Sequence, residues 1–251
     1  MIFERLDLDE VDWAHLDAFA DRIVYQTREW VEFIADTQGA EPVVASLNDG
    51  SSARGYFTGL IVRRYGLSIL GSPMPGWTTG FMGFNLDPGV SRGEATEALL
   101  EFAFGDLGCA HLELKDPHLE LADVEGLGFQ YTAWRGLELD LSPTEEEIFA
   151  SFNGRNRTAV RKAERSGVVI EEADDEGFVD DIYPQIEDVF RKQGLAPPYG
   201  PDRIREMIRH VQPSGRLLML RARDSEGTCI ATGIYALMNR TMHWVGSLRM
   251  S

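Results

Sequence analysis

A short basic segment stands out in a chain that is otherwise acidic. The 251 residues carry a formal net charge of −17, yet residues 152–168 contain a cluster of cations and a single acid, Glu164. On a helix, residues four apart lie on the same face, so several of these cations form one narrow stripe. Such a stripe attracts a phosphate, a carboxylate or an acidic protein surface. The cations are Arg155, Arg157, Arg161, Lys162 and Arg165.

A plainer interpretation of the same segment is a helix face that is simply solvated. Runs of charge most often have this explanation. In that case the cations pair with acids that follow them in the chain, such as Glu171 and Glu172. Charge alone favours this alternative over a ligand site.

The order of residues within the segment adds a resemblance. Residues 157–168 read R-x-x-V-R-K-A-E-R-x-G-V. This motif resembles one in the FemAB-type transferases. These are the peptidoglycan-bridge aminoacyltransferases and their broader acyltransferase relatives. They are built from two GNAT-like domains in tandem. Residues 25–30 (Y-Q-T-R-E-W) resemble the early helix of that family, and residues 70–79 (L-G-S-P-M-P-G-W-T-T) resemble its mid-domain loop.

The resemblance implies where substrates bind. The first domain provides an acceptor cleft, and the second domain handles the acyl donor. The implied cleft wall consists of Trp30, the loop carrying Trp77, and the basic helix with Arg157, Arg161 and Lys162. A departure from the family pattern occurs at Ile34, where the peptidoglycan-bridge members often carry a lysine suited to a nucleotide-diphosphate acceptor; this favours the broader acyltransferase branch.

Two further residues are candidates for the site. Tyr199 lies on a Pro/Gly loop between two expected helices, where GNAT folds often contact the acceptor, and we expect it to form part of the substrate wall. His243 lies on the last expected strand and is a weak candidate for a general base, because its ordinary pKa is near neutrality. The ordinary alternatives are packing roles for His243 and Trp30 in the core.

The resemblance therefore predicts an N-acyltransferase with acyl-CoA or aminoacyl-tRNA as donor and no metal. The acceptor would be an amine on a cell-envelope precursor or a small molecule. Nucleic acid would be a partner only if the donor is a tRNA. The alternative is a non-catalytic, degenerate GNAT-fold module that binds an anionic ligand. Ser-His-Asp, H-E-x-x-H, C-x-x-C and Walker patterns are absent from the sequence, which weakens hydrolase, zinc and NTPase interpretations.

Composition sets broader limits. No run of about 18 apolar residues occurs, so we expect no membrane span. The N-terminus lacks the basic and apolar regions of a secretory signal, which predicts a cytoplasmic protein. Cys109 and Cys229 lie in apolar stretches without metal or disulfide spacing and are expected to be buried thiols. The 41 acids argue against general nucleic-acid binding.

Hydrophobic periodicity predicts a mixed α/β fold with sequential strands. The resemblance implies that this fold is GNAT-like (α+β), with two domains in tandem, and the first half covers residues 1–143. We expect helices in this half at 11–23, 28–36 and 93–104, with residues 71–83 forming a loop. The strands expected in this half are 2–6, 42–47, 55–62, 67–70, 110–114 and 131–141.

The second half, residues 144–251, repeats the cycle. Ser142 or Thr144 should cap an acid-rich first helical turn at the boundary. After it we expect strands at 168–172, 217–222, 229–237 and 241–247 and helices at 178–191 and 202–211. A complete GNAT-like domain would need more strands, so this half is expected to be incomplete. Its last strand would be an open edge that favours self-association, and the 251-residue chain would then turn over little acyl-CoA.

Overall fold

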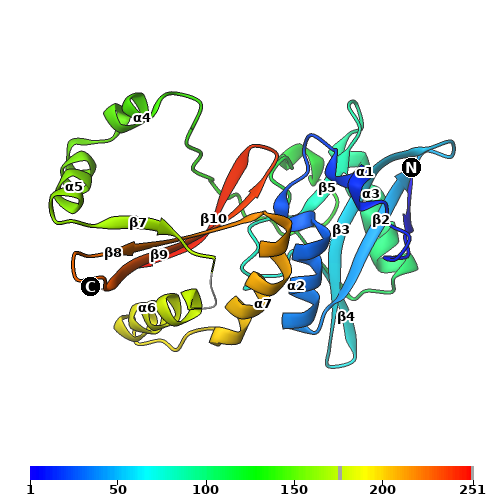
Figure 1. The fold of residues 1–251 in the computed structure, drawn as a ribbon. Coiled ribbons are helices and arrows are strands. Elements are labelled where there is room, and N and C mark those ends of the chain that lie inside the picture. Colours follow the sequence, from blue (N-terminus) through cyan, green and yellow to red (C-terminus); the bar gives the residue numbers. More distant parts are fainter. Residues whose placement is uncertain (175–176, 250–251) are drawn as a thin grey trace.

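A mixed six-stranded sheet forms the first part of the protein (Figure 1). The computed structural model describes residues 1–174 and 177–249, so Met250 and Ser251 lie outside the described residues. The strand order is β1-β2-β3-β4-β6, and β5 pairs with the other end of β3. Neighbours are antiparallel except β4 and β6, which run parallel. The strands are β1 (Ile2–Arg5), β2 (Glu41–Asn48), β3 (Ala53–Arg64), β4 (Leu67–Ser72), β5 (Gly83–Leu86) and β6 (His111–Leu114).

Helices cover both faces of this sheet. α2 (Arg28–Gln38) turns an apolar stripe with Trp30 and Phe33 inward and ends at Gly39, whose φ of 58° suits glycine. α3 (Arg92–Glu101), capped by Ser91, packs with β1 and continues into the π-helical turn η2. The remaining elements of this part are α1 (Trp13–Asp17), η1 (Val24–Gln26), η2 (Phe102–Asp106) and η3 (Leu121–Asp123).

The second part contains an antiparallel four-stranded sheet in the order β10-β9-β8-β7. α6 packs on β8, β9 and β10, and its Pro184 lies inside the helix. Within the described chain, β10 pairs with β9 only. The elements are α4 (Glu145–Ser151), α5 (Gly154–Arg165), β7 (Val169–Glu172), α6 (Phe178–Lys192), α7 (Pro201–Val211), η4 (Gln212–Ser214), β8 (Leu217–Arg223), β9 (Cys229–Met238) and β10 (Thr241–Arg249).

The two parts share one apolar core at their junction. α2 and α7 pack side by side between the sheets (Figure 1). One continuous cluster of buried side chains runs from Trp30 and Phe33 of α2, through Met82, to Met207 of α7 and Ile234 of β9. A separate cluster fills the space between the first sheet and α3. The junction is therefore built like a protein interior rather than a wet contact.

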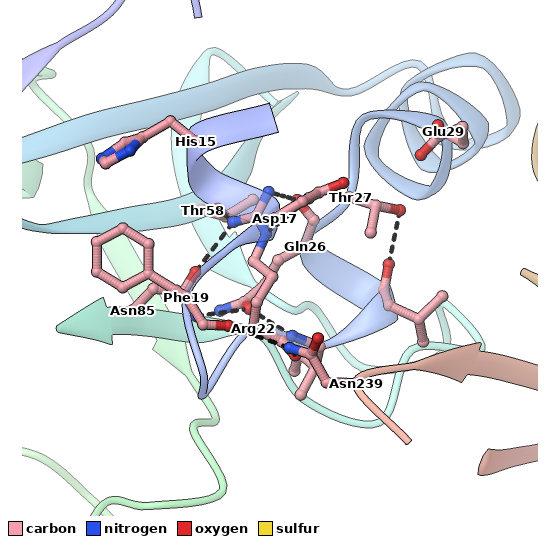
Figure 2. Close-up of polar contacts among 12 residues, drawn as sticks. His15, Asp17, Phe19, Arg22, Gln26, Thr27, Glu29, Thr58, Asn85 and Asn239 are labelled. Atoms are coloured by element: carbon pink, nitrogen blue, oxygen red, sulfur yellow. Dashed lines mark hydrogen bonds and ion pairs between the residues drawn. The ribbon is translucent and has the colours of Figure 1, made fainter. Parts of the chain in front are cut away.

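A network of buried polar groups fixes the same junction (Figure 2). The side chain of Arg22 is fully buried and donates hydrogen bonds to Asp17, to Asn85 Oδ1 at 2.9 Å and to the backbone oxygen of Gln26. Burial lowers the pKa of Arg22 to about 10 although the charge of Asp17 opposes this shift. Asp17 also accepts from Arg216 at 2.6 Å, which ties the residue directly before β8 to the first part.

The turn between β9 and β10 adds a second tie. Asn239 Nδ2 donates to the backbone oxygens of Phe19 at 3.1 Å and Arg22 at 2.8 Å (Figure 2). Asn239 adopts a φ of 47°, a conformation that asparagine tolerates better than most residues. The hairpin tip thus docks on the segment that carries Arg22.

One expected strand is absent. Residues 131–141 form no strand, and their alternating apolar side chains are exposed; Leu137 is 102% and Trp134 75% exposed. The alternation is real, but a strand forms only where a neighbour accepts its backbone hydrogen bonds, and no described strand pairs with these residues. Trp134 instead packs under Lys115, whose Nζ lies 4.6 Å from the ring centroid.

Other expectations differ in detail. The helix expected at 11–23 is confined to α1, after which the chain turns so that Arg22 can point inward. The expected loop 71–83 ends in β5, a strand that was missed because its four residues are all buried and show no alternation. Thr144 caps α4 as predicted: its hydroxyl accepts from the backbone N–H of Glu147, and the Glu147 carboxylate accepts from that of Thr144.

The domain division stays a prediction. The two sheets are separate, as a boundary near residue 144 implies, but they share the core described above. None of the helices in the described ranges is long and apolar enough to cross a membrane.

Replacing Arg22 with alanine should destabilise the fold by about 3 kcal/mol or more, because its buried hydrogen-bond partners lose their donor. Arg28→Ala removes only an exposed pair with Glu32 and should cost about 0.5 kcal/mol. Urea unfolding of both variants measures the difference. Equal losses would show that the Arg22 network does not stabilise the junction.

Candidate functional site

A small pocket opens at the junction of the two parts. Its cavity volume is about 40 Å³ and its lining is mostly apolar. The walls come from the loop before β5, from α6 and α7, from the segment between those helices, and from β9 and β10. The lining residues are Thr78, Ile182, Ile186, Tyr199, Arg203, Ile204, Met207, Ile234 and Val245.

Arg203 is the charged residue of this lining. It lies in the first turn of α7, next to Ile204 on the buried side of the helix. Its Nη2 donates to the backbone oxygen of Trp77 at 2.6 Å, and its guanidinium lies 5.6 Å from the ring centroids of Phe33 and Tyr199. Burial lowers the pKa of Arg203, while Tyr199 opposes this shift.

Arg203 has no carboxylate partner among the described residues. The two buried arginines of the described ranges, Arg22 and Arg221, lie within 3.3 Å of a carboxylate oxygen, and so do the half-buried Arg92 and Arg216. Arg157 is also half-buried, and two backbone oxygens are its partners. Arg203 forms no ion pair with any residue in the described ranges, and its buried Nε has no hydrogen-bond partner there. A half-buried cation without a counter-ion favours an anionic group at this position.

The loop beside Arg203 has a fixed shape. Trp30 is fully buried, and its Nε1 donates to Thr79 Oγ1 at 3.0 Å. Thr78 has a φ of 61°, which is uncommon for a β-branched residue and often marks a functional loop. Trp77 is also buried, so Trp30 and Trp77 belong to the core of the junction and do not present open ring faces.

His243 lies near this pocket on β10. His243 is half-buried, whereas its neighbours Met242 and Trp244 are exposed. Val245 of the pocket lining follows two residues later, at the register shift between Trp244 and Gly246. Its ring packs against Tyr25 and Phe81, with centroids 5.3 and 5.6 Å away.

The surroundings of His243 keep its ring neutral. Burial lowers its pKa, and the charge of Glu138 raises it by a smaller amount. Its Nε2 is buried and meets no partner among the described residues. A neutral imidazole with an unengaged ring nitrogen is able to accept a proton.

The basic helix lies elsewhere. Figure 1 shows α4 and α5 beyond β7, far from α2 and α7. Arg157 closes the end of α4 by donating to the backbone oxygens of Ala150 and Phe152, and the guanidinium of Arg161 lies 5.3 Å from the centroid of Phe149. Lys162 is exposed. The acid Glu171 pairs with Arg221 and Arg223 instead of the basic helix.

The structure thus brings Trp30, Trp77, Tyr199 and His243 to one junction and leaves the basic helix outside it. Arg203 was not among the site residues predicted from the sequence. A signal was present: on α7 the apolar residues Ile204, Met207 and Val211 mark the buried face, and Arg203 directly precedes the first of them.

The lowered pKa of His243 predicts a pH dependence of stability. Because the folded state binds this proton less readily than the unfolded chain, the stabilisation is complete above the ordinary value of 6.5 and is lost as pH falls below it. The slope should stay below about 1.4 kcal/mol per pH unit, the limit for one proton.

This slope is measurable as the difference between the parent protein and His243→Phe in urea unfolding from pH 7.5 to pH 5. The variant should lose less stability than the parent over that range. Parallel curves would mean that His243 titrates normally.

The chain resembles a known protein in structure but not in sequence. No protein-family model and no curated protein matches the sequence. Among solved structures, the crystal structure of FemX superposes with a TM-score of 0.69 at 14% identity and covers 99% of this chain and 81% of its own. At this identity the likeness establishes the fold alone. The chain has a mixed α/β fold of the FemAB type, as in FemX.

Proposed function

We propose that the protein is an N-acyltransferase of the FemAB type that binds an anionic substrate at Arg203. The observation that carries this proposal is the uncompensated, half-buried guanidinium at the edge of an apolar pocket, within a FemAB-type fold. CoA and tRNA donors carry phosphates, and envelope precursors carry phosphates or carboxylates. The cavity of about 40 Å³ is a subsite for such a group or for a short acyl chain, with the rest of the substrate outside it.

The reaction joins an amine to the donor carbonyl carbon. The amine nitrogen forms the new C–N bond, the C–S bond of CoA or the ester C–O bond of an aminoacyl-tRNA breaks, and the leaving group departs as a thiol or hydroxyl after taking up a proton. The amine must be neutral when it attacks. Binding and alignment of both substrates account for much of the rate in such transfers, with no covalent enzyme intermediate.

His243 is the candidate for receiving the proton that the amine loses. Its lowered pKa keeps the imidazole neutral near pH 7, and its free Nε2 lies at the same junction as the pocket. Tyr199 and the Trp77 loop form the wall that Arg203 holds in place. The acceptor class is an amine of an envelope precursor or a small molecule, and the reaction takes place in the cytoplasm.

Arg203→Gln tests the proposal directly. Loss of a charge-assisted hydrogen bond costs about 1.5–3 kcal/mol, so kcat/KM should fall by roughly tenfold to a hundredfold. Arg203→Lys should recover part of the loss. The assay follows thiol release from acetyl-CoA and longer acyl-CoA donors, and amide formation from aminoacyl-tRNA, over a panel of amines.

Arg205→Gln is the matched control, because Arg205 lies two residues away on the exposed side of α7 and pairs with Asp202. Its activity should match that of the parent. Turnover with no donor, or equal turnover in both glutamine variants, would remove the support for this function.

The basic helix allows a separate test of the tRNA donor. If Arg157, Arg161 and Lys162 contact a tRNA, replacing all three with glutamine should weaken tRNA binding and reduce its salt dependence, with acyl-CoA turnover unchanged. Filter binding at several salt concentrations measures this effect. Unchanged tRNA affinity would show that these side chains do not bind tRNA. Their role would then be structural, because two of the three already contact α4 or the residue that follows it.

A further inference from the structure

Three potential metal ligands meet where α2 and α7 cross. His210 Nε2 lies 2.9 Å from Asp36 Oδ2 and 3.7 Å from Glu206 Oε2. All three ligand atoms lie within 4.8 Å of one another. The side chain of His210 is 11% exposed, so its imidazole is held firmly at the helix contact.

Helix geometry explains this convergence. Glu206 and His210 are four residues apart on α7 and therefore share one face. Asp36 projects from the last turns of α2, which packs against that face. The three ligands thus come from both parts of the protein, and the site exists only when the junction is formed.

A positive group already occupies the centre of this cluster. Arg209 Nη2 lies 3.2 Å from Asp36 Oδ2 and 3.0 Å from His210 Nε2, and it also pairs closely with Glu206 Oε2. The guanidinium nitrogen therefore contacts every one of the three ligand atoms. Arg209 is 60% exposed and is able to swing into solvent, and exposed ion pairs of this kind are weak.

The hydrogen bonds around His210 conflict when the imidazole is neutral. If Nε2 carries a hydrogen it donates to Asp36 but opposes the N–H of Arg209; if it does not, its lone pair accepts from Arg209 and faces the oxygen of Asp36. A metal ion removes this conflict, because it accepts the lone pairs of the imidazole and both carboxylates at once.

We propose that Asp36, Glu206 and His210 bind a divalent transition-metal ion such as Zn²⁺, with Arg209 as the cation it displaces. In a tetrahedral zinc site with bonds of about 2.0–2.2 Å, ligand atoms lie about 3.4 Å apart. The separations of 2.9 and 3.7 Å bracket that value. One imidazole and two carboxylates suit zinc better than Mg²⁺, which prefers oxygen ligands in octahedral geometry.

An open groove beside the cluster gives the metal a path and room for water. The groove has a cavity volume of about 400 Å³ and is bordered by Asp36, Thr37, Glu206 and Arg209, and also by Asp202 and Arg203. A water molecule from this side is able to complete the coordination. Bound metal would clamp α2 to α7 one helical turn from Arg203, so it would stabilise the wall of the candidate pocket. This inference does not depend on the acyl-transfer proposal.

The test is calorimetric titration of the purified full chain with ZnCl₂, followed by thermal melting with and without the ion. We expect one Zn²⁺ per chain and a higher melting temperature, with no response to MgCl₂. His210→Gln and Asp36→Asn should each weaken binding at least about tenfold, since even outer-shell changes have effects of that size. Both substitutions nearly preserve side-chain volume, and circular dichroism verifies folding.

Arg209→Ala separates a metal site from an ordinary ion-pair network. Removing a positive charge a few ångströms from the ion should tighten Zn²⁺ binding roughly tenfold or more. His111→Gln, which alters an exposed histidine beside Glu113, is the control and should leave binding unchanged. Absence of a one-to-one Zn²⁺ response, equal binding by His210→Gln, or weaker binding by Arg209→Ala would each overturn the proposal.

Discussion

The arrangement of the two sheets depends on a chain of charges that water does not reach freely. Asp17 lies between Arg22, which is fully buried, and Arg216, which directly precedes β8 and also pairs with Glu29 of α2. Burying a guanidinium is costly unless acceptors replace the water that it loses. The first part supplies those acceptors through Asn85 and the backbone of Gln26, and the second part docks onto the remaining charge of Asp17. The two parts therefore meet in one orientation, and this orientation fixes the positions of the residues that line the pocket.

The fixed geometry of the junction makes Arg203 a candidate anion-binding residue. In water a guanidinium is easily solvated, so its positive charge alone does not indicate that it binds an anionic ligand. Between Phe33, Tyr199 and the backbone of Trp77, the same group has lost part of its water and received one carbonyl in return. The fold holds it there because the surrounding core is already closed by α2 and α7. The cost of that desolvation is offset when an anion binds.

The sequence pattern predicted those strands and helix caps that depend on residues close to one another in the chain. The apolar runs of β2 and β3 and the N-cap of α4 at Thr144 are each decided within a few residues. Alternation alone failed at residues 131–141, because a strand also needs a neighbour, and periodicity does not report whether one exists. Part of the candidate site was predicted for the same reason: Tyr199 lies on a recognisable Pro/Gly loop, whereas Arg203 carries no mark in sequence except its place beside an apolar face.

Charge density along the chain was a poor guide to where charge matters. The basic segment concentrates cations in sequence, but they are spread over an exposed helix, where solvent and the backbone of α4 satisfy them. Arg203, and the cluster of Asp36, Glu206 and His210, show the opposite pattern. Their members are unremarkable in sequence. Asp36 lies on α2, far along the chain from Glu206 and His210 on α7, and only the junction brings the three together. For Arg203, partial desolvation strengthens its interaction with an anion, because the strength of an electrostatic interaction depends on the surrounding dielectric. The packing of the junction, and not local composition, therefore decides which charges are available for binding.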